Sequence, residues 1–337
     1  MMATNPTPNR SENTAGAAGI ANPAGMAPNA TPDHDTDPGA QVTASHAWDA
    51  AAEGWNHHAP LLHNWLHAPT AALLDAAGIQ TGARVLDIAA GAGDQTLDIA
   101  QRVGSGGHVL ATDISPRILA LARDKLHRAG FDGVTTQVAD AQDLGRVAGI
   151  AGAGFDAAVC RLGLMFCERP LGALSGALAA LRPGGGFSAL VFSAPLANPC
   201  IAIMAATARR HAGLAPASPF EPGTLMSLGQ PGLLAELLAS AGFEQINVRA
   251  IAAPMRLPSV GHYLHFVQTA GLPIMALLAP LPLDAQAAAW HDIEQQLQRF
   301  NTSDEWLGPN ELLLCSARRP TLDASGKTDP AAGQAFG

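Results

Sequence analysis

A short turn of small residues, 89–93, is the part of this sequence best suited to hold a ligand. It follows an apolar stretch at 84–88 and precedes a helical pattern that begins near Asp94, so it joins a strand to a helix. Gly91 and Gly93 carry no Cβ, which lets a ligand approach the backbone closely. Two cofactor classes, dinucleotides and S-adenosylmethionine, bind at turns of this kind.

The residues around the turn favour one of these classes. A dinucleotide site needs a third glycine where this sequence has Thr96. Asp87, at the carboxyl end of the first strand, would repel a pyrophosphate. The same carboxylate would attract the ammonium and sulfonium groups of S-adenosylmethionine.

Two further aspartates follow the next two strands. Asp113 lies 113 − 93 = 20 residues after Gly93, where a carboxylate accepts hydrogen bonds from ribose hydroxyls in either cofactor class. Asp140 and Ala141 follow the third strand. A carboxylate there can accept from an adenine amino group, and the next backbone N–H can donate to the ring.

The elements that position these residues alternate between strands and helices. Short apolar strands are expected at 84–88, 108–112, 134–139, 155–160, 187–192, 245–251 and 311–317. Ser115-Pro116 is typical of a helix start, and the triplets at 129–131 and 241–243 (Ala-Gly-Phe) are typical of helix ends. The pattern predicts an α/β fold with a seven-stranded, mostly parallel, doubly wound sheet.

The chain divides into one domain and two tails. Residues 1–43 and 319–337 are polar and of low complexity, and we expect them to be disordered. The domain covers 44–318, with helical caps at 44–80, 194–230 and 254–310. In the first cap, Pro60 and Pro69 are expected to divide short helices.

The composition limits which partners the protein can bind and in which compartment we expect it. The net charge is −9, and there is no block of lysine and arginine, so we expect no nucleic-acid partner. No apolar run is long enough to span a bilayer. The four cysteines (Cys160, Cys167, Cys200 and Cys315) form no C-x-x-C pair and are expected to be reduced, mostly buried thiols, which fits a cytoplasmic protein.

The stretch 84–192 resembles a class I (Rossmann-like) S-adenosylmethionine-dependent methyltransferase. It is most similar to the group that contains the ubiquinone/menaquinone C-methyltransferases and many small-molecule methyltransferases. That group often has alanine where Ala89 stands and continues Gly-x-Gly-Asp, as 91–94 do; 109–116, 161–166 and 181–185 resemble its later motifs.

The resemblance implies a role for each matching residue. Those expected at the methionine end of the cofactor are Asp87, Ala89, Gly91 and Gly93, with Asp113 and Ile114 at the ribose and Asp140 and Ala141 at the adenine. Arg161 would lie near the reaction centre, although half of a structural ion pair is an equally good interpretation.

Histidines supply the candidates for a general base. His57 and His58 in the first cap, and His262 and His265 in the third, belong to segments that should fold over the methyl group, and His57 or His58 is the preferred base. A surface or structural histidine is the competing interpretation for each. The run that includes His63 and His67 also suggests a metal, but no acidic or cysteine ligand accompanies it at a familiar spacing, so none is expected.

The sequence therefore predicts methyl transfer from S-adenosylmethionine to a small molecule, with O-, N- and C-methylation all open. Six apolar cap residues suggest a pocket for an apolar or aromatic acceptor, or equally a helical core: Trp55, Trp65, Phe266, Met275, Leu277 and Leu278. The alternatives are a non-catalytic cofactor-binding scaffold and an NAD-dependent oxidoreductase. The sequence carries no signal for the oligomeric state.

Overall fold

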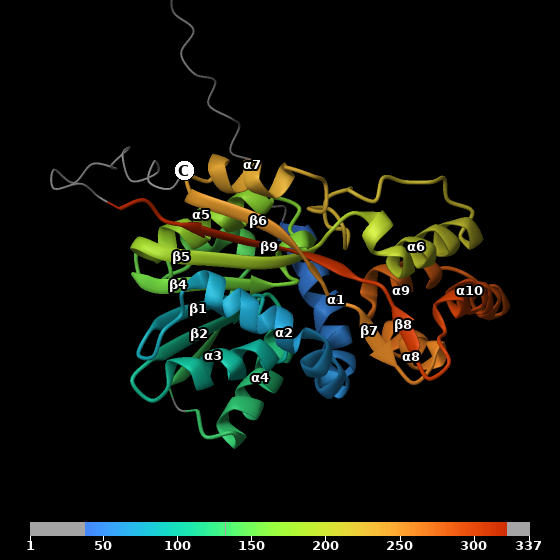
Figure 1. Cartoon of the computed structure of the whole chain (residues 1–337), viewed down its shortest axis with the longest axis horizontal. Coiled ribbons are helices and arrows are strands. Elements are labelled where there is room, and N and C mark those ends of the chain that lie inside the picture. The colour runs from blue at the N-terminus through green and yellow to red at the C-terminus, as the bar shows by residue number, and fades with distance from the viewer. Residues whose placement is uncertain (1–37, 132, 322–337) are drawn as a thin grey trace, which may run out of the picture. The chain divides into compact units, whose positions relative to one another are not determined.

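A computed structural model describes residues 38–131 and 133–321 (Figure 1). The first helix, α1 (Pro38–His57), already includes 38–43, the last six residues of the expected amino-terminal tail. At the other end, Arg319 was expected in a tail but donates to the carbonyls of Leu178 and Ala179, so its guanidinium is held against the domain. The described elements therefore extend a few residues past both expected domain boundaries, and the disorder of the tails stays a prediction. The remaining parts of both tails, 1–37 and 322–337, lie outside the described residues.

A seven-stranded sheet forms the centre of the domain. Its order is β3 (Val134–Val138), β2 (His108–Asp113), β1 (Arg84–Ile88), β4 (Phe155–Arg161), β5 (Leu181–Phe192), β9 (Glu311–Arg318) and β6 (Glu244–Ala252). The pairs from β3 to β5 are parallel, and β9 runs antiparallel between β5 and β6. The predicted α/β fold with a mostly parallel, seven-stranded sheet is confirmed.

Helices cover both faces of this sheet. On one face lie α2 (Ala59–Ala77), α3 (Asp94–Val103) and α4 (Pro116–Arg128); on the other lie α5 (Pro170–Ala180) and α7 (Leu233–Ser240) (Figure 1). Pro60 is near the start of α2 as expected, but Pro69 lies inside this helix and does not divide it. The buried side chains of Leu66, Leu73 and Leu74 hold α2 on the sheet, so packing compensates for the hydrogen bond that Pro69 cannot donate.

The start of α4 and the ends of α4 and α7 lie where the sequence pattern predicted. Ser115 caps α4, where its Oγ accepts from the Ile118 N–H at 3.0 Å. After α4 and α7, Gly130 and Gly242 adopt left-handed φ values of 79° and 93°. The phenylalanine behind each glycine then packs on the core.

A second apolar cluster lies beside the sheet. Its helices are α6 (Pro199–His211), α8 (Val260–Ala270), α9 (Leu272–Leu278) and α10 (Leu283–Leu297), which Figure 1 shows gathered together. The segment 254–310 was expected to be helical, yet it also contains a two-stranded sheet of β7 (Met255–Leu257) and β8 (Trp306–Gly308). Trp306 is fully buried there and stacks on Tyr263 with ring centroids 4.5 Å apart.

Candidate cofactor and acceptor site

The turn between β1 and α3 holds three residues with positive φ: Ala89 (54°), Gly91 (57°) and Gly93 (85°). A Cβ added at Gly91 would meet nothing within 4 Å, so this glycine faces open space. A Cβ at Gly93 would lie 3.0 Å from the Cβ of Ala122 on α4. The two glycines therefore differ in purpose: Gly91 leaves room for a ligand, and Gly93 lets two helices pack closely.

Ala89 owes its space to another glycine. A Cβ at Gly163, which follows β4, would lie 2.4 Å from the Cβ of Ala89. The short loop after β4 thus comes directly against the turn after β1, which brings the ends of these two strands together.

Asp87 is fully buried at the end of β1 and is engaged within the protein. Its Oδ2 accepts from the Thr96 hydroxyl at 2.7 Å, and its Oδ1 accepts from the Gln95 side-chain amide. Burial raises the pKa of Asp87 to about 7, against the lowering effect of these hydrogen bonds. Asp87 therefore fastens the first turn of α3, and Thr96 has a structural use at the position where a dinucleotide site has glycine.

Asp113 ties the turn after β1 to the loop after β2. Its Oδ2 accepts from the Gly91 N–H and its Oδ1 from the Ser115 N–H, each at 3.0 Å. Burial raises the pKa of this carboxyl group, although hydrogen bonds from the backbone of Ser115, Gly91 and Ile114 lower it. A carboxylate has about four acceptor positions, so these three donors leave capacity for a further one.

Helix α1 lies over this loop. The Ser45 hydroxyl donates to the Ile114 carbonyl at 3.1 Å, and Asp49 accepts from the Arg117 N–H at 3.1 Å and from the Ser115 hydroxyl. Ser45 and Asp49 were not identified from the sequence. Their hydrogen-bond partners are more than 60 residues away in sequence, so no local pattern predicts these contacts.

The third aspartate, Asp140, begins a short 3-10 helix, η1 (Ala141–Arg146). Its Oδ1 accepts from the Gln142 N–H at 2.9 Å, so the carboxylate caps η1. Because β1, β2 and β3 are parallel neighbours, Asp87, Asp113 and Asp140 all come at the same edge of the sheet. Ala141 follows directly and is half-buried.

Arg161 ends β4, and its guanidinium donates to the Thr70 hydroxyl on α2 at 2.8 Å. Among the described residues, no carboxylate oxygen lies within ion-pair distance of it. The described residues therefore show no direct ion pair for Arg161, which was the alternative interpretation of this residue. Burial lowers the pKa of Arg161, and Asp94 and Asp87 act in the opposite direction.

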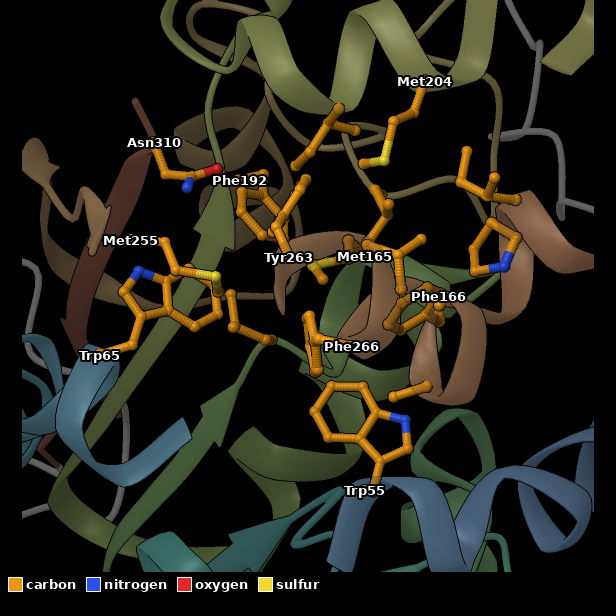
Figure 2. Close-up of a pocket in the computed structure, with 18 of the residues that line it drawn as sticks. Trp55, Trp65, Met165, Phe166, Phe192, Met204, Met255, Tyr263, Phe266 and Asn310 are labelled. Carbon is orange, nitrogen blue, oxygen red and sulfur yellow. The ribbon is translucent and has the colours of Figure 1, made fainter. Parts of the chain in front are cut away.

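An apolar cavity adjoins this edge of the sheet (Figure 2). About 710 Å³ of space between protein atoms lies here, part of it open to solvent. Its walls include Trp48, Trp55, Trp65, Leu162, Met165, Phe166, Phe192, Met204, Tyr263 and Phe266. Figure 2 shows Trp55 and Phe266 projecting from one side and Met204 from the opposite side. Since Leu162 directly follows Arg161, the cavity reaches the end of β4.

The polar groups of this cavity are few. Asn310 and Tyr263 belong to its lining, and the buried Nε1 of Trp55 has no hydrogen-bond partner among the described residues. Three of the six apolar residues expected in a pocket (Trp55, Trp65, Phe266) do line the cavity. Leu277 and Leu278 belong to the neighbouring helical core, and Met275 is not in the lining, so the two interpretations each hold for part of the set.

The histidines separate into groups. His57, His58 and His265 come together, with ring centroids 4.9 to 6.4 Å apart. His262 pairs instead with the Ser259 hydroxyl at 2.9 Å. None of these four side chains belongs to the cavity lining. Burial lowers the pKa of His58, with His57 and His265 adding to the effect. A general-base role for His57 or His58 stays a prediction.

The chain is similar to known methyltransferases. The family described as "Methyltransferase domain" matches residues 79–223. The ubiquinone/menaquinone biosynthesis C-methyltransferase UbiE of Idiomarina loihiensis is 37% identical over 124 residues, which cover 36% of this chain and 48% of that protein. The UbiE of Azotobacter vinelandii is 38% identical over 123 residues, which cover 36% and 47%. The chain thus spans about half the length of these curated relatives.

Solved structures agree on the fold. A putative methyltransferase from Bacillus halodurans matches with a TM-score of 0.51 at 18% identity, over 75% of this chain and all of that one. The YcgJ protein of Bacillus subtilis matches with a TM-score of 0.52 at 14% identity, over 75% and 98%. Residues 79–223 are thus similar to a methyltransferase domain, and the chain shares its fold with these solved structures.

Proposed function

We propose that this protein transfers a methyl group from S-adenosylmethionine to an apolar or aromatic small molecule bound in the cavity. The observation that carries the proposal is a nearly wholly apolar cavity at the ends of β4 and β5, on the same edge of the sheet that bears Asp87, Asp113 and Asp140. A cavity walled by aromatic rings and methionines favours an acceptor of the same character. The acceptor atom, oxygen, nitrogen or carbon, is left open.

The described residues fit the cofactor. Open space above Gly91 leaves room for it against the backbone. The Asp113 carboxylate retains acceptor capacity for ribose hydroxyls, with Ile114 beside it, and Asp140 and Ala141 stand at the next strand end for the adenine. Ala89 and Gly93 shape the turn, and Asp87 acts through Gln95 and Thr96 at the start of α3. The hydrogen bonds of Asp87 and Asp113 keep the turn after β1 in a fixed conformation before the cofactor binds.

S-adenosylmethionine supplies an electrophilic methyl group when it is bound. The chain's own contribution is to align the acceptor and exclude water, and alignment alone can supply much of a rate enhancement. The lining offers Tyr263, whose pKa burial raises, so its hydroxyl stays protonated and can donate a hydrogen bond. Asn310 and the Trp55 N–H are the other polar points that can orient an acceptor. Arg161 adds a positive charge near the reaction centre.

Calorimetric titration with S-adenosylmethionine tests the cofactor half of the proposal. We expect wild-type protein to bind, and the Asp113→Ala variant to bind at least ten-fold more weakly, because ribose hydrogen bonds are lost. The melting temperature of each protein should be measured, since Asp113 also holds Gly91. Absence of wild-type binding would count against catalysis.

A panel of aromatic and polar acceptors tests the other half. Phe266→Ala should lower kcat/KM for aromatic acceptors and leave the Kd of S-adenosylmethionine unchanged. Leu196→Ala is the control, because Leu196 is 98% exposed and away from the lining. Equal effects of the two substitutions would refute the cavity as the acceptor site. Binding without turnover on the whole panel would favour a cofactor-binding scaffold.

The base hypothesis needs its own variants. His57→Ala and His58→Ala should slow turnover if either imidazole removes a proton from the acceptor. Unchanged turnover in both would remove the hypothesis.

Two expectations about the setting also stay predictions. The four cysteines are buried and unpaired, which supports a reducing, cytoplasmic compartment. Among the described helices, none is long and apolar enough to cross a membrane. The expected lack of a nucleic-acid partner can be checked by a binding assay with DNA and RNA.

A further inference from the structure

Three histidines from two distant segments meet at one place. His57 ends α1, His58 precedes α2, and His265 lies on α8. Each offers a ring nitrogen, and the three nitrogens lie within 4.8 Å of one another. No metal was expected here because no acidic or cysteine ligand accompanies the amino-terminal histidines in sequence, and His265 is about 200 residues away from them.

The cluster is close to the geometry that a zinc site needs. Tetrahedral zinc holds imidazole nitrogens at about 2.0–2.1 Å, so two ligand nitrogens stand roughly 3.3 Å apart. His57 and His265 are exposed, and small side-chain rotations would close the remaining gap. Their exposure also leaves a fourth position open to water.

The hydrogen bonding of His58 prepares it as a ligand. The Thr269 hydroxyl lies 2.8 Å from the His265 carbonyl oxygen, to which it can donate. With that bond made, Thr269 Oγ1 accepts from His58 Nε2 at 2.7 Å, and this tautomer leaves Nδ1 free to bind a metal. Metal-binding histidines commonly donate their other ring N–H to a fixed acceptor, and the Thr269 oxygen would be that acceptor here.

We propose that His57, His58 and His265 bind one divalent transition-metal ion of the zinc type, which fastens the α1–α2 junction to α8. These helices already touch closely: a Cβ at Gly54 would lie 2.0 Å from the Thr269 carbonyl oxygen. Trp55 and Phe266 lie close to these ligands in sequence, and their ring centroids are 6.2 Å apart across the same junction. Both side chains line the cavity. The ion would thus hold one wall of the cavity together.

The test is calorimetric titration of the full-length, chelator-treated protein with zinc chloride. We expect one ion per chain with a Kd below about 1 μM, and at least a hundred-fold weaker binding in His265→Asn, because a three-histidine site becomes a two-histidine site. His57→Asn should behave in the same way. Both side chains are exposed, so neither substitution should disturb folding, and circular dichroism with a thermal melt checks this.

A matched control lies on α2. His63 and His67 are exposed, one helical turn apart, with ring centroids at 5.5 Å, and form a rival two-histidine site. The double variant His63→Asn/His67→Asn should keep the wild-type Kd. Zinc should also raise the melting temperature of wild type and of this control but not of His265→Asn.

Three results would overturn the proposal: no zinc binding by wild type, unchanged binding in both His57→Asn and His265→Asn, or loss of binding in the control. Each result concerns zinc alone, so it is independent of whether the protein binds S-adenosylmethionine or transfers a methyl group.

Discussion

Replacing Gly93 by alanine should destabilise the domain much more than the same change at Gly91. Both positions have positive φ, which costs an alanine about 1–2 kcal/mol. At Gly93 the new methyl group also meets the Cβ and Cα of Ala122, at 3.0 and 3.1 Å. Ala122 is fully buried and has no flexible side chain to move, so α4 itself must shift, at about 1–3 kcal/mol. We expect total losses of about 2–5 kcal/mol for Gly93→Ala and about 1–2 kcal/mol for Gly91→Ala.

A double-mutant cycle with Ala122→Gly isolates the steric part. By itself, Ala122→Gly costs about 1 kcal/mol in helix propensity, plus the loss of a buried methyl group. In combination with Gly93→Ala it removes the contact with the Ala122 Cβ but not the one with its Cα, so the pair should show a favourable coupling that is part of the steric cost of about 1–3 kcal/mol. The same change combined with Gly91→Ala should be additive, because nothing lies within 4 Å of that methyl position.

Urea unfolding of the five variants and wild type measures these values from the midpoints at constant m-value. Titration with S-adenosylmethionine completes the comparison: Gly91→Ala should weaken binding although it folds well, since its methyl group enters the space proposed for the cofactor. Equal destabilisation by the two alanines, or a Gly93–Ala122 coupling below about 0.5 kcal/mol, would refute the assignment of these two glycines.

Three further predictions concern pH, a buried amide and the cover of the cofactor loop. Burial raises the pKa of Asp87 from 3.8 to about 7, so between these pH values the native state keeps a proton that the unfolded chain releases. The free energy of unfolding should therefore fall as pH rises from about 4 to 7. Urea unfolding at several pH values should show that Asp87→Asn loses this part of the pH dependence. Asn198 is fully buried, donates to the Ser193 hydroxyl at 3.0 Å and accepts from the Glu311 N–H at 3.0 Å, so Asn198→Ala should cost about 2–4 kcal/mol, and an unchanged urea midpoint would contradict this. Asp49→Ala removes an acceptor at the first turn of α4 and should cost about 1 kcal/mol in the same assay; a larger effect on the Kd of S-adenosylmethionine than on stability would show that α1 also covers the cofactor.

The parts of the fold that the sequence predicted are those fixed by local chemistry. Ser115-Pro116 starts a helix, and Gly130 and Gly242 end helices, because caps and left-handed turns depend on residues close in the chain. The sheet was predictable because alternating strands and helices allow few other arrangements. The β7–β8 pair was missed, since its short strands lie some 50 residues apart and neither is distinctive alone.

For the candidate site, the strand pattern was enough to predict that Asp87, Asp113 and Asp140 share one edge, because parallel neighbouring strands bring their carboxyl ends together. The packing of the helices in three dimensions sets what surrounds them: Gly93 serves helix packing while Gly91 faces open space, and α1 covers the loop after β2. It also decided that His265 joins His57 and His58, more than 200 residues away. Contacts between residues so far apart in sequence depend on how whole helices pack, and the spacing of side chains along the chain does not predict that packing.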